Sequence, residues 1–315
     1  MPTATPTKIK IPKAKPAVAA RPETHTSVMV DEVLKGLDVQ PGELVLDATA
    51  GQGGHSFAIL KSQPKAKILA LDADAGAVTL AQARLKSFGA RAEVVQANFA
   101  EIAKVLKSQK VKTINKALFD LGWNRGQLQS GRGFSFLHDE PLVMSYGKKP
   151  LSGFTAEEIV NEWDEETLGN VFFGYGEERY ARRIAKAIID RRKIQPIKTT
   201  IELVEIIRDA VPANYRRSRL HPATKTFQAL RIAVNNELGA IDQGVREAWA
   251  ALSSGGRIAI ITFHSIEDRA VKKLFVEIAK TKGKLVYKKP LAPTQREIIS
   301  NPSARSAKLR VIEKI

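Results

Sequence analysis

Residues 44–56 limit what this chain can fold into more than any other stretch. An apolar run of strand type ends at Asp47, a turn with three glycines follows, and an apolar-periodic helix is predicted to begin at about Ser56. Glycine tolerates positive φ and lets a ligand lie against bare backbone, and a helix start offers unpaired N–H groups that favour negative charge. A second apolar run ends at Asp72, where a carboxylate can accept hydrogen bonds from ribose hydroxyls. The pattern predicts a nucleoside-binding strand–helix–strand unit and leaves both NAD and S-adenosylmethionine open as its ligand.

The same alternation continues along the chain and predicts an α/β fold with a doubly wound parallel sheet. Further strands are expected over residues 93–99 and 116–122, with helices between the strands. Asn98 and Asp120 stand at the polar ends of these two strands, as the two acids above do in the first two. Ligands bind at the carboxyl edge of open α/β sheets, so the four polar side chains predict one shared site.

After residue 128 the alternation stops, and we expect an inserted helical domain over residues 129–222 that recognises the substrate. Helices are predicted from Thr155 and over residues 167–173, 177–193 and 200–210. The functional interpretation of the basic residues in this insertion is a surface that faces RNA. The alternative is a solvated helix face, and for any single basic residue this alternative is the better explanation. The basic residues are Arg179, Arg182, Arg183, Lys186, Arg191, Arg192, Lys193, Arg216, Arg217 and Arg219.

The α/β pattern then returns, so residues 24–128 and 223–315 are expected to form one core interrupted by the insertion. The last strands are predicted to pair with each other at the end of the chain. The expected elements are helices over residues 224–238, 241–252 and 266–280, a buried strand over 255–265, and the strand pair 284–287 and 307–312.

A strong positive charge marks the composition. The 50 lysines and arginines outnumber the 33 aspartates and glutamates, which gives a net charge of +17 and a pI near 9.9. A protein this basic often binds a polyanion, because each neutralised phosphate releases counterions, so nucleic acid is favoured over a general effect on solubility. Residues 1–23 lack a periodic apolar face and are expected to be a disordered basic tail, either simply solvated or touching RNA.

Other residue types exclude several kinds of site. The absence of cysteine rules out disulfides, thiolate zinc sites and a cysteine nucleophile. The five histidines are scattered without ligand spacing, so no metal site is expected. No apolar run is long enough to span a bilayer, and the N-terminus lacks the apolar middle of a secretory signal. A cytoplasmic protein without membrane contact is the expectation.

Dispersed motifs add a family resemblance. The chain is similar to the bacterial 16S rRNA (cytosine-N4)-methyltransferase family, RsmH or MraW, from about residue 24 to its C-terminus. The motifs that carry the resemblance are His25-Thr26-Ser27-Val28, Gly51-Gln52-Gly53-Gly54-His55-Ser56, Asp120-Leu121-Gly122, Arg132-Gly133-Phe134-Ser135-Phe136, Tyr175-Gly176-Glu177-Glu178-Arg179, His221-Pro222-Ala223-Thr224-Lys225-Thr226-Phe227-Gln228-Ala229-Leu230-Arg231-Ile232, Phe263-His264-Ser265-Ile266-Glu267-Asp268-Arg269 and Asn301-Pro302-Ser303-Ala304-Arg305-Ser306-Ala307-Lys308-Leu309-Arg310.

The resemblance implies a class I, Rossmann-like methyltransferase that uses S-adenosylmethionine. Its substrate would be a cytidine in the decoding region of 16S rRNA, within the small ribosomal subunit. In this family's pattern the glycines and the histidine line the cofactor loop, Asp72 lies at the ribose, Phe99 lies beside the adenine, and Asp120 and Gln127 lie near the methionine end. The cofactor-binding residues so implied are Gly53, Gly54, His55, Asp72, Phe99, Asp120 and Gln127.

The expected chemistry requires an acceptor at the cytosine amine, because the lone pair of that amine is delocalised into the ring. A group that accepts the N–H proton, with Asp120 and the backbone carbonyls after it as the candidates, would make the amine a better nucleophile. The chain departs from the family directly after that residue, where 123–126 replace a small apolar residue, two serines and a proline. We expect Trp123 to stack on the target base and Asn124 to replace a serine hydroxyl as acceptor.

A second departure covers residues 141–147, where two acids and an arginine of the family's usual pattern are missing. Both altered segments are expected to line the target pocket. The alternatives are therefore a divergent homologue with a changed RNA target, or a non-catalytic RNA-binding protein of ribosome assembly. A nicotinamide oxidoreductase is the competing class of enzyme, and the sequence leaves a homodimer open.

Overall fold

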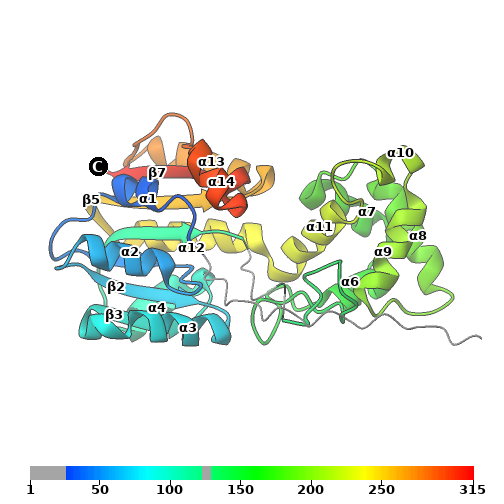
Figure 1. The fold of residues 1–315 in the computed structure, drawn as a ribbon, viewed down its shortest axis with the longest axis horizontal. Coiled ribbons are helices and arrows are strands. Elements are labelled where there is room, and N and C mark those ends of the chain that lie inside the picture. The colour runs from blue at the N-terminus through cyan, green and yellow to red at the C-terminus, as the bar shows by residue number, and fades with distance from the viewer. Residues whose placement is uncertain (1–25, 123–127, 129) are drawn as a thin grey trace, which may run out of the picture.

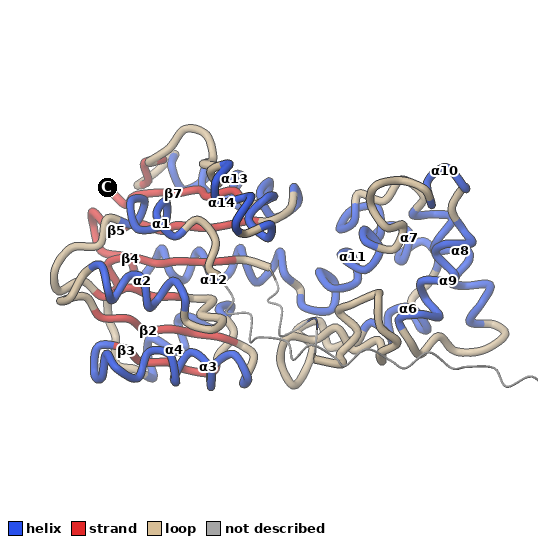
Figure 2. The backbone as a smooth tube through the Cα atoms, viewed as in Figure 1, coloured by secondary structure: helices blue, strands red, loops and turns tan. Residues whose placement is uncertain are grey.

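The structure, a computed structural model, describes residues 26–122, residue 128 and residues 130–315. Within these ranges the chain forms an α/β part on one seven-stranded sheet and a helical part beside it (Figure 1). The loops that follow the parallel strands lie on the side of the sheet that faces the helical part (Figure 2). Among the described residues, no helix combines the length and the apolar character that crossing a membrane requires.

The sheet is the doubly wound sheet that the sequence predicts. Its order is β3-β2-β1-β4-β5-β7-β6, with parallel pairing from β3 to β5. β7 is antiparallel to both of its neighbours, which confirms the predicted strand pair at the end of the chain. The strands are β1 (Leu44–Asp47), β2 (Lys67–Asp72), β3 (Ala92–Gln96), β4 (Ile114–Asp120), β5 (Leu252–Thr262), β6 (Gly283–Leu285) and β7 (Lys308–Lys314).

Helices cover both faces of this sheet. In β4, Leu118 packs into a cluster with α1, α2 and α3, whereas Ala117 and Phe119 pack into the opposite cluster with α4, α12 and α13. Strands buried on both faces read as continuous apolar runs, which is why the sequence shows them clearly. The helices here are α1 (Val30–Leu37), α2 (Gly54–Ser62), α3 (Ala75–Leu85), α4 (Ile102–Ser108), α12 (Glu237–Ala251), α13 (Ser265–Ala279) and α14 (Gln295–Ser300), with the short 3-10 helices η1 (Lys86–Arg91), η2 (Phe99–Glu101) and η3 (Pro302–Ser306).

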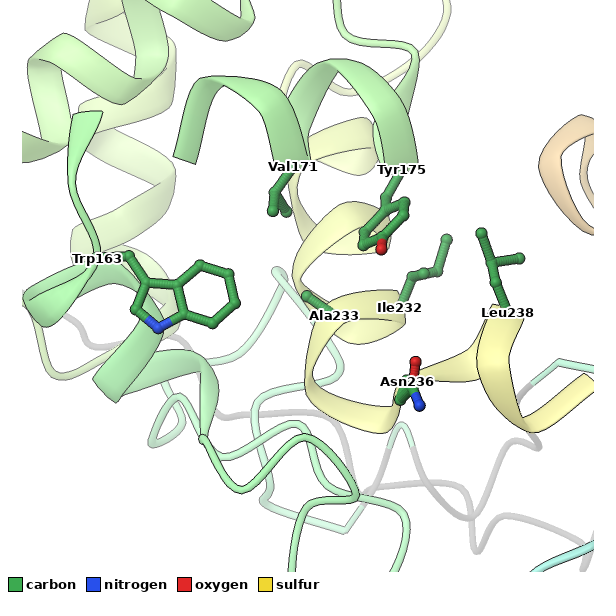
Figure 3. A pocket seen from close by; sticks show the side chains of 7 residues that line it. All are labelled: Trp163, Val171, Tyr175, Ile232, Ala233, Asn236 and Leu238. Atoms are coloured by element: carbon green, nitrogen blue, oxygen red, sulfur yellow. The ribbon is translucent and has the colours of Figure 1, made fainter. Parts of the chain in front are cut away.

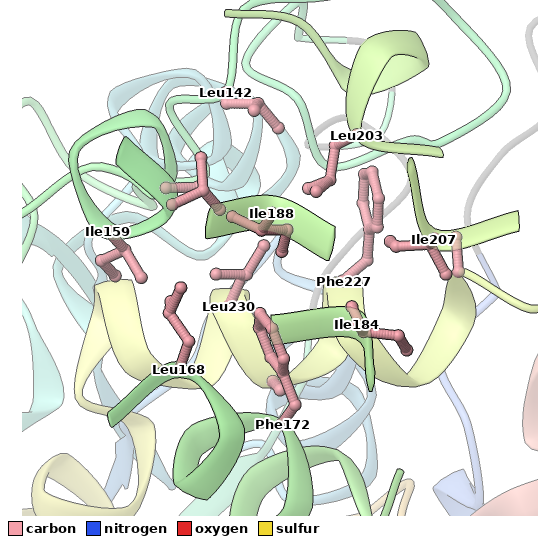
Figure 4. Packing of buried hydrophobic residues seen from close by; sticks show 14 of the residues in the cluster. Leu142, Ile159, Leu168, Phe172, Ile184, Ile188, Leu203, Ile207, Phe227 and Leu230 are labelled. Carbon is pink, nitrogen blue, oxygen red and sulfur yellow. The ribbon is translucent and has the colours of Figure 1, made fainter. Parts of the chain in front are cut away.

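The helical part has its own apolar core, in which Phe172, Ile188 and Leu230 are fully buried (Figure 4). Capping boxes start two of its helices, with Thr155 and Glu158 at α6 and Thr199 at α9. Its described helices are α6 (Ala156–Glu162), α7 (Glu165–Gly176), α8 (Ala181–Arg192), α9 (Thr200–Ala210), α10 (Ala213–Arg216) and α11 (Thr224–Asn235).

The single helix predicted over residues 177–193 is wrong at its start. Glu177 takes a left-handed conformation with φ of 50°, and α8 begins only four residues later. Glu178 is buried, and its carboxylate accepts hydrogen bonds from the Tyr180 backbone N–H at 2.8 Å and from the Tyr215 hydroxyl at 2.6 Å. The local bond from Tyr180 and the long-range bond from Tyr215 hold residues 178–180 outside the helix.

The return to the α/β part also differs from the expectation. Phe227 and Leu230 of α11 pack in the helical core, although the sequence analysis places the return at residue 223. Asn236, with φ of 43°, separates α11 from α12, which replaces the predicted break after residue 238. The α11–α12 junction is therefore where the chain passes from the helical part to the α/β part.

Candidate active site

The turn after β1 presents bare backbone at the carboxyl edge of the sheet. Gly51 and Gly53 have φ of 52° and 75°, a region that glycine adopts without strain. A Cβ at Gly53 would lie 3.3 Å from the Cα of Ala81, so α2 and α3 pack closely there. A Cβ at Gly51 would meet no heavy atom within 4 Å. The turn is therefore packed against protein on one side and open on the other.

A buried carboxylate, Asp47, holds this turn from inside. The Ser56 hydroxyl donates to one of its oxygens at 2.6 Å, and the Thr49 backbone N–H donates to the other at 3.3 Å. The Thr49 hydroxyl also accepts from the Asp120 backbone N–H at 2.6 Å, which ties the turn to the end of β4. Burial raises the pKa of Asp47, and the Ser56 bond offsets part of this rise. The roles of the Ser56 and Thr49 hydroxyls are not predictable from the sequence, because only the folded turn brings them to their partners.

Asp72 faces the same turn from the end of β2. One of its oxygens accepts from the Gly51 backbone N–H at 2.8 Å, and the other accepts from the Asp74 backbone N–H at 2.8 Å. A carboxylate offers roughly four lone-pair sites, so it can still accept bonds from a ligand's hydroxyl groups. Burial raises the pKa of Asp72 to about 6 even though both backbone bonds act to lower it.

His55 and Asp120 form a buried pair beside the turn. The His55 Nε2 atom lies 3.4 Å from the Asp120 Oδ2 atom, but among the described residues neither His55 nitrogen has an aligned hydrogen-bond partner. The Asp120 Oδ1 atom is also buried without a partner in the same part of the chain. Burial lowers the pKa of His55, but the Asp120 carboxylate more than compensates and raises it overall. Buried polar atoms normally find partners, so these three atoms point to a ligand that supplies them.

A pocket of about 250 Å³ opens where the ends of β2 and β3 meet the helical part. Ala97 and Asn98 line it from the sheet side. Phe99 turns away from it and packs edge-on against Phe119 at 5.8 Å between ring centroids. The pocket lies at the nucleoside end of the predicted site, next to Asp72. Its lining residues are Ala73, Gln96, Ala97, Asn98, Glu101, Tyr146, Gly147, Lys149, Leu151 and Asn235.

Arg132 joins the helical part to the sheet next to this pocket. Its guanidinium donates to the Asp74 carboxylate at 2.6 Å and to the backbone carbonyls of Ser145 and Tyr146 at 3.0 and 2.9 Å. The second altered segment is thus held at the pocket by a residue of the Arg-Gly-Phe-Ser-Phe motif. The motif alone does not reveal this role of Arg132, because its partner Asp74 lies 58 positions away in the chain.

A buried polar cluster lies at the α11–α12 junction. The Arg231 guanidinium binds Glu237 through two hydrogen bonds of 2.7 and 2.9 Å, and the Tyr146 hydroxyl donates to the same carboxylate at 2.9 Å. His264 caps the start of α13, with its Nε2 atom 3.0 Å from the Glu267 carboxylate and 3.3 Å from Arg231. Ligand atoms of the two glutamates and the histidine lie within 4.8 Å of one another, close enough to share a metal ion. Arg231 already neutralises Glu237, so we read the cluster as a junction between the two parts.

A second cavity, of about 120 Å³, lies on the helical side of the same junction. Trp163 and Tyr175 flank it, with Asn236 at its rim (Figure 3). Most of its lining comes from α7, α11 and the start of α12, so it is separate from the glycine turn. Its remaining lining residues are Val171, Ile232, Ala233 and Leu238.

The structure brings most of the predicted cofactor residues to one edge of the sheet. Direct contacts join His55 to Asp120, and Asp72 to the glycine turn that contains Gly53 and Gly54. Phe99 lies next to the pocket in sequence, but its ring belongs to the sheet core. Three other predicted residues lie outside the described residues, namely Trp123, Asn124 and Gln127.

Comparison with known proteins identifies close sequence relatives. A family model described as the MraW methylase family matches residues 23–315. The chain is 42% identical over 310 residues to ribosomal RNA small subunit methyltransferase H of Brevibacillus brevis, covering 92% of this chain and 98% of that protein. It is 44% identical over 292 residues to the protein of the same name from Sulfurihydrogenibium sp., covering 92% and 99%. A solved rRNA methylase from Streptococcus thermophilus aligns with a TM-score of 0.43 at 11% identity, over 91% of this chain and 93% of that one.

Proposed function

This chain belongs to the MraW methylase family, and from that premise we propose that it methylates N4 of a cytidine in small-subunit ribosomal RNA, with S-adenosylmethionine as the methyl donor. One observation carries the proposal. An open glycine turn, the Asp72 carboxylate and the buried His55–Asp120 pair, with its unpartnered atoms, meet at one edge of a parallel sheet. Family membership also decides against a nicotinamide oxidoreductase.

The residues at this edge fit the cofactor. S-adenosylmethionine, when bound, supplies a methyl group that is already activated on a sulfonium. The backbone at Gly53 and Gly54 would lie against its methionine part, and Asp72 would accept hydrogen bonds from its ribose. The unpartnered atoms of His55 and Asp120 would face its methionine end, together with Gln127. The pocket beside Asp72 has room for the adenine, and a role for Phe99 there stays a prediction.

The protein's main tasks in this reaction are positioning and proton transfer. Holding donor and amine in line supplies much of the rate, because little covalent help is needed. Asp120 is suited to accept the amine proton, since its Oδ1 atom is buried and has no partner among residues 26–122, 128 and 130–315. Trp123 as the stacking partner of the base and Asn124 as a second acceptor remain predictions.

The RNA context is the finer part of the proposal. We infer that the substrate is 16S rRNA in the decoding region of an assembled small subunit, and that the helical part recognises it. A homodimer and a cytoplasmic location remain predictions of the same kind. The altered segments 123–126 and 141–147 leave a changed target nucleotide, or a non-catalytic role in ribosome assembly, as the rival hypotheses.

Two measurements test the proposal. In calorimetry, S-adenosylmethionine should bind the purified protein and NAD should not. Mass mapping of small-subunit rRNA from a strain that lacks this gene should show one cytidine without its methyl group, and the gene supplied in trans should restore it. Binding without any missing methyl group would favour the non-catalytic role, and absence of binding would contradict the proposed cofactor.

Asp72 should make cofactor binding depend on pH. The ribose hydroxyls donate to the charged carboxylate, so binding favours the deprotonated form and lowers a pKa that is about 6 in the free protein. Affinity for S-adenosylmethionine should therefore rise as the pH is raised through about 6 and level off above it. Calorimetry across this range checks the slope. Asp72→Asn should bind more weakly and lose the slope, and an unchanged slope in that variant would assign it to another group.

A further inference from the structure

Two rings in the helical part form an ordered stack at the surface. Phe136 and His221 lie with ring centroids 4.7 Å apart and planes only 9° from parallel. Phe227 of the helical core packs edge-on against Phe136, with 5.6 Å between the ring centroids, and so holds the Phe136 ring in place. His221 is exposed to solvent, while Phe136 covers one face of its ring.

The surroundings of His221 suit it to stacking rather than to acid–base chemistry. Burial of part of the ring lowers its pKa, so the imidazole is neutral at pH 7. Its Nδ1 atom accepts from the Ala223 backbone N–H at 3.3 Å, which fixes the ring's orientation. Leu137 and Leu220, each next in sequence to one of the two rings, are 72% and 49% exposed. The two rings therefore have exposed apolar neighbours in the chain.

Three arginines lie shortly before His221 in the chain. Arg216, Arg217 and Arg219 are exposed, and within the described ranges no carboxylate lies within ion-pair distance of them. By contrast, Lys186 of α8 and Lys193, which follows that helix, both pair with Asp190. The arginines around residues 216–219 are thus available to bind phosphates.

We propose that the His221–Phe136 stack is a platform for an unpaired base of the RNA substrate, with Arg216, Arg217 and Arg219 binding the adjoining phosphates. The inference rests on the proposed function, which makes the partner RNA. Single-stranded RNA is recognised by aromatic stacking combined with basic side chains, and both are present here. An acidic protein segment would use the arginines but would not need an open ring face. We name Phe136, Leu137, His221, Leu220 and the three arginines the stacking surface.

Two substitutions at one position separate stacking from a structural role. His221→Asn removes the ring but keeps an acceptor for the Ala223 N–H, whereas His221→Phe keeps the ring and loses the acceptor. If the ring binds a base, His221→Asn should weaken binding of a labelled single-stranded decoding-region RNA by roughly tenfold, and His221→Phe by no more than about twofold. The reverse order, or equal binding by both variants, would overturn the inference. Circular dichroism melts confirm that each variant is folded.

Charge is tested by the salt dependence of the same binding. Arg217→Gln with Arg219→Gln should reduce the slope of log affinity against log salt by roughly 0.7 for each lost phosphate contact. Arg208→Gln, an exposed arginine on α9 beside Asp209, is the matched control and should leave the slope unchanged. Equal slopes in all three proteins would count against the phosphate contacts.

A methylation assay on small subunits that lack the modification distinguishes failure of the stacking proposal from failure of the proposed function. The wild type should methylate them, and His221→Asn should raise KM with kcat nearly unchanged. If the wild type fails to methylate them, the proposed function is wrong. The RNA affinities of the wild type, His221→Asn and His221→Phe still show whether His221 stacks on a base. If the wild type methylates and His221→Asn has a normal KM and normal RNA affinity, only the platform fails.

Discussion

Replacing Asp120 with asparagine should lower the rate of methyl transfer by roughly a hundredfold or more, because general-base catalysis contributes about that much. The Asp120 Oδ1 atom is buried at the carboxyl end of β4, with no partner in the part of the chain that the structure describes, and an amide of the same shape cannot take up the amine proton. The backbone N–H of residue 120 would still donate to Thr49, so the turn should keep its form. Single-turnover methylation of unmodified small subunits measures the rate, and calorimetry measures cofactor affinity.

The matched control is Asp139→Asn, which removes the same charge from an exposed position of the helical part. It should methylate at the wild-type rate. A folded Asp120→Asn variant with a normal rate would show that another group accepts the proton. A variant that loses cofactor affinity but recovers its rate at saturating cofactor would make Asp120 a binding residue only.

The sheet edge could be predicted because each of its parts is local in the sequence. Parallel strands buried on both faces give apolar runs, and the polar residue that ends each run falls on the same edge by topology alone. Asp72 and Asp120 were found in this way. The glycine turn was equally local, since the left-handed φ values at Gly51 and Gly53 favour that residue type.

The remaining features depend on partners far away in the chain. Nothing around Glu178 predicts that it accepts a bond from Tyr215, and that bond separates α7 from α8. Arg132 looks like any exposed arginine until the fold brings Asp74 to 2.6 Å. Apolar periodicity shows that α11 is amphipathic, but it cannot show which of two cores its apolar side covers. Only tertiary packing decides such points.

Truncating Arg231 should cost the protein more stability than truncating any exposed arginine. Arg231→Met leaves Glu237 and Glu267 buried without their shared cation, and breaking a buried ion pair typically costs about 3 to 5 kcal/mol in the free energy of unfolding. Arg246→Met is the matched control. Arg246 also makes two bonds to one carboxylate, Glu277, at 2.9 and 3.0 Å, but its side chain is 45% exposed against 9% for Arg231.

Burial should decide the difference between these two variants. The exposed pair is screened by water, so Arg246→Met should cost less than about 1 kcal/mol. Urea unfolding followed by circular dichroism gives both free energies. Adding Glu237→Gln to Arg231→Met should recover part of the loss, because the second change removes the stranded charge. Equal losses in the two single variants, or a fully additive double variant, would show that the α11–α12 junction does not depend on its buried charges. A loss of stability in Arg231→Met alone, partly recovered by Glu237→Gln, would show that this buried cluster stabilises the junction between the helical part and the sheet.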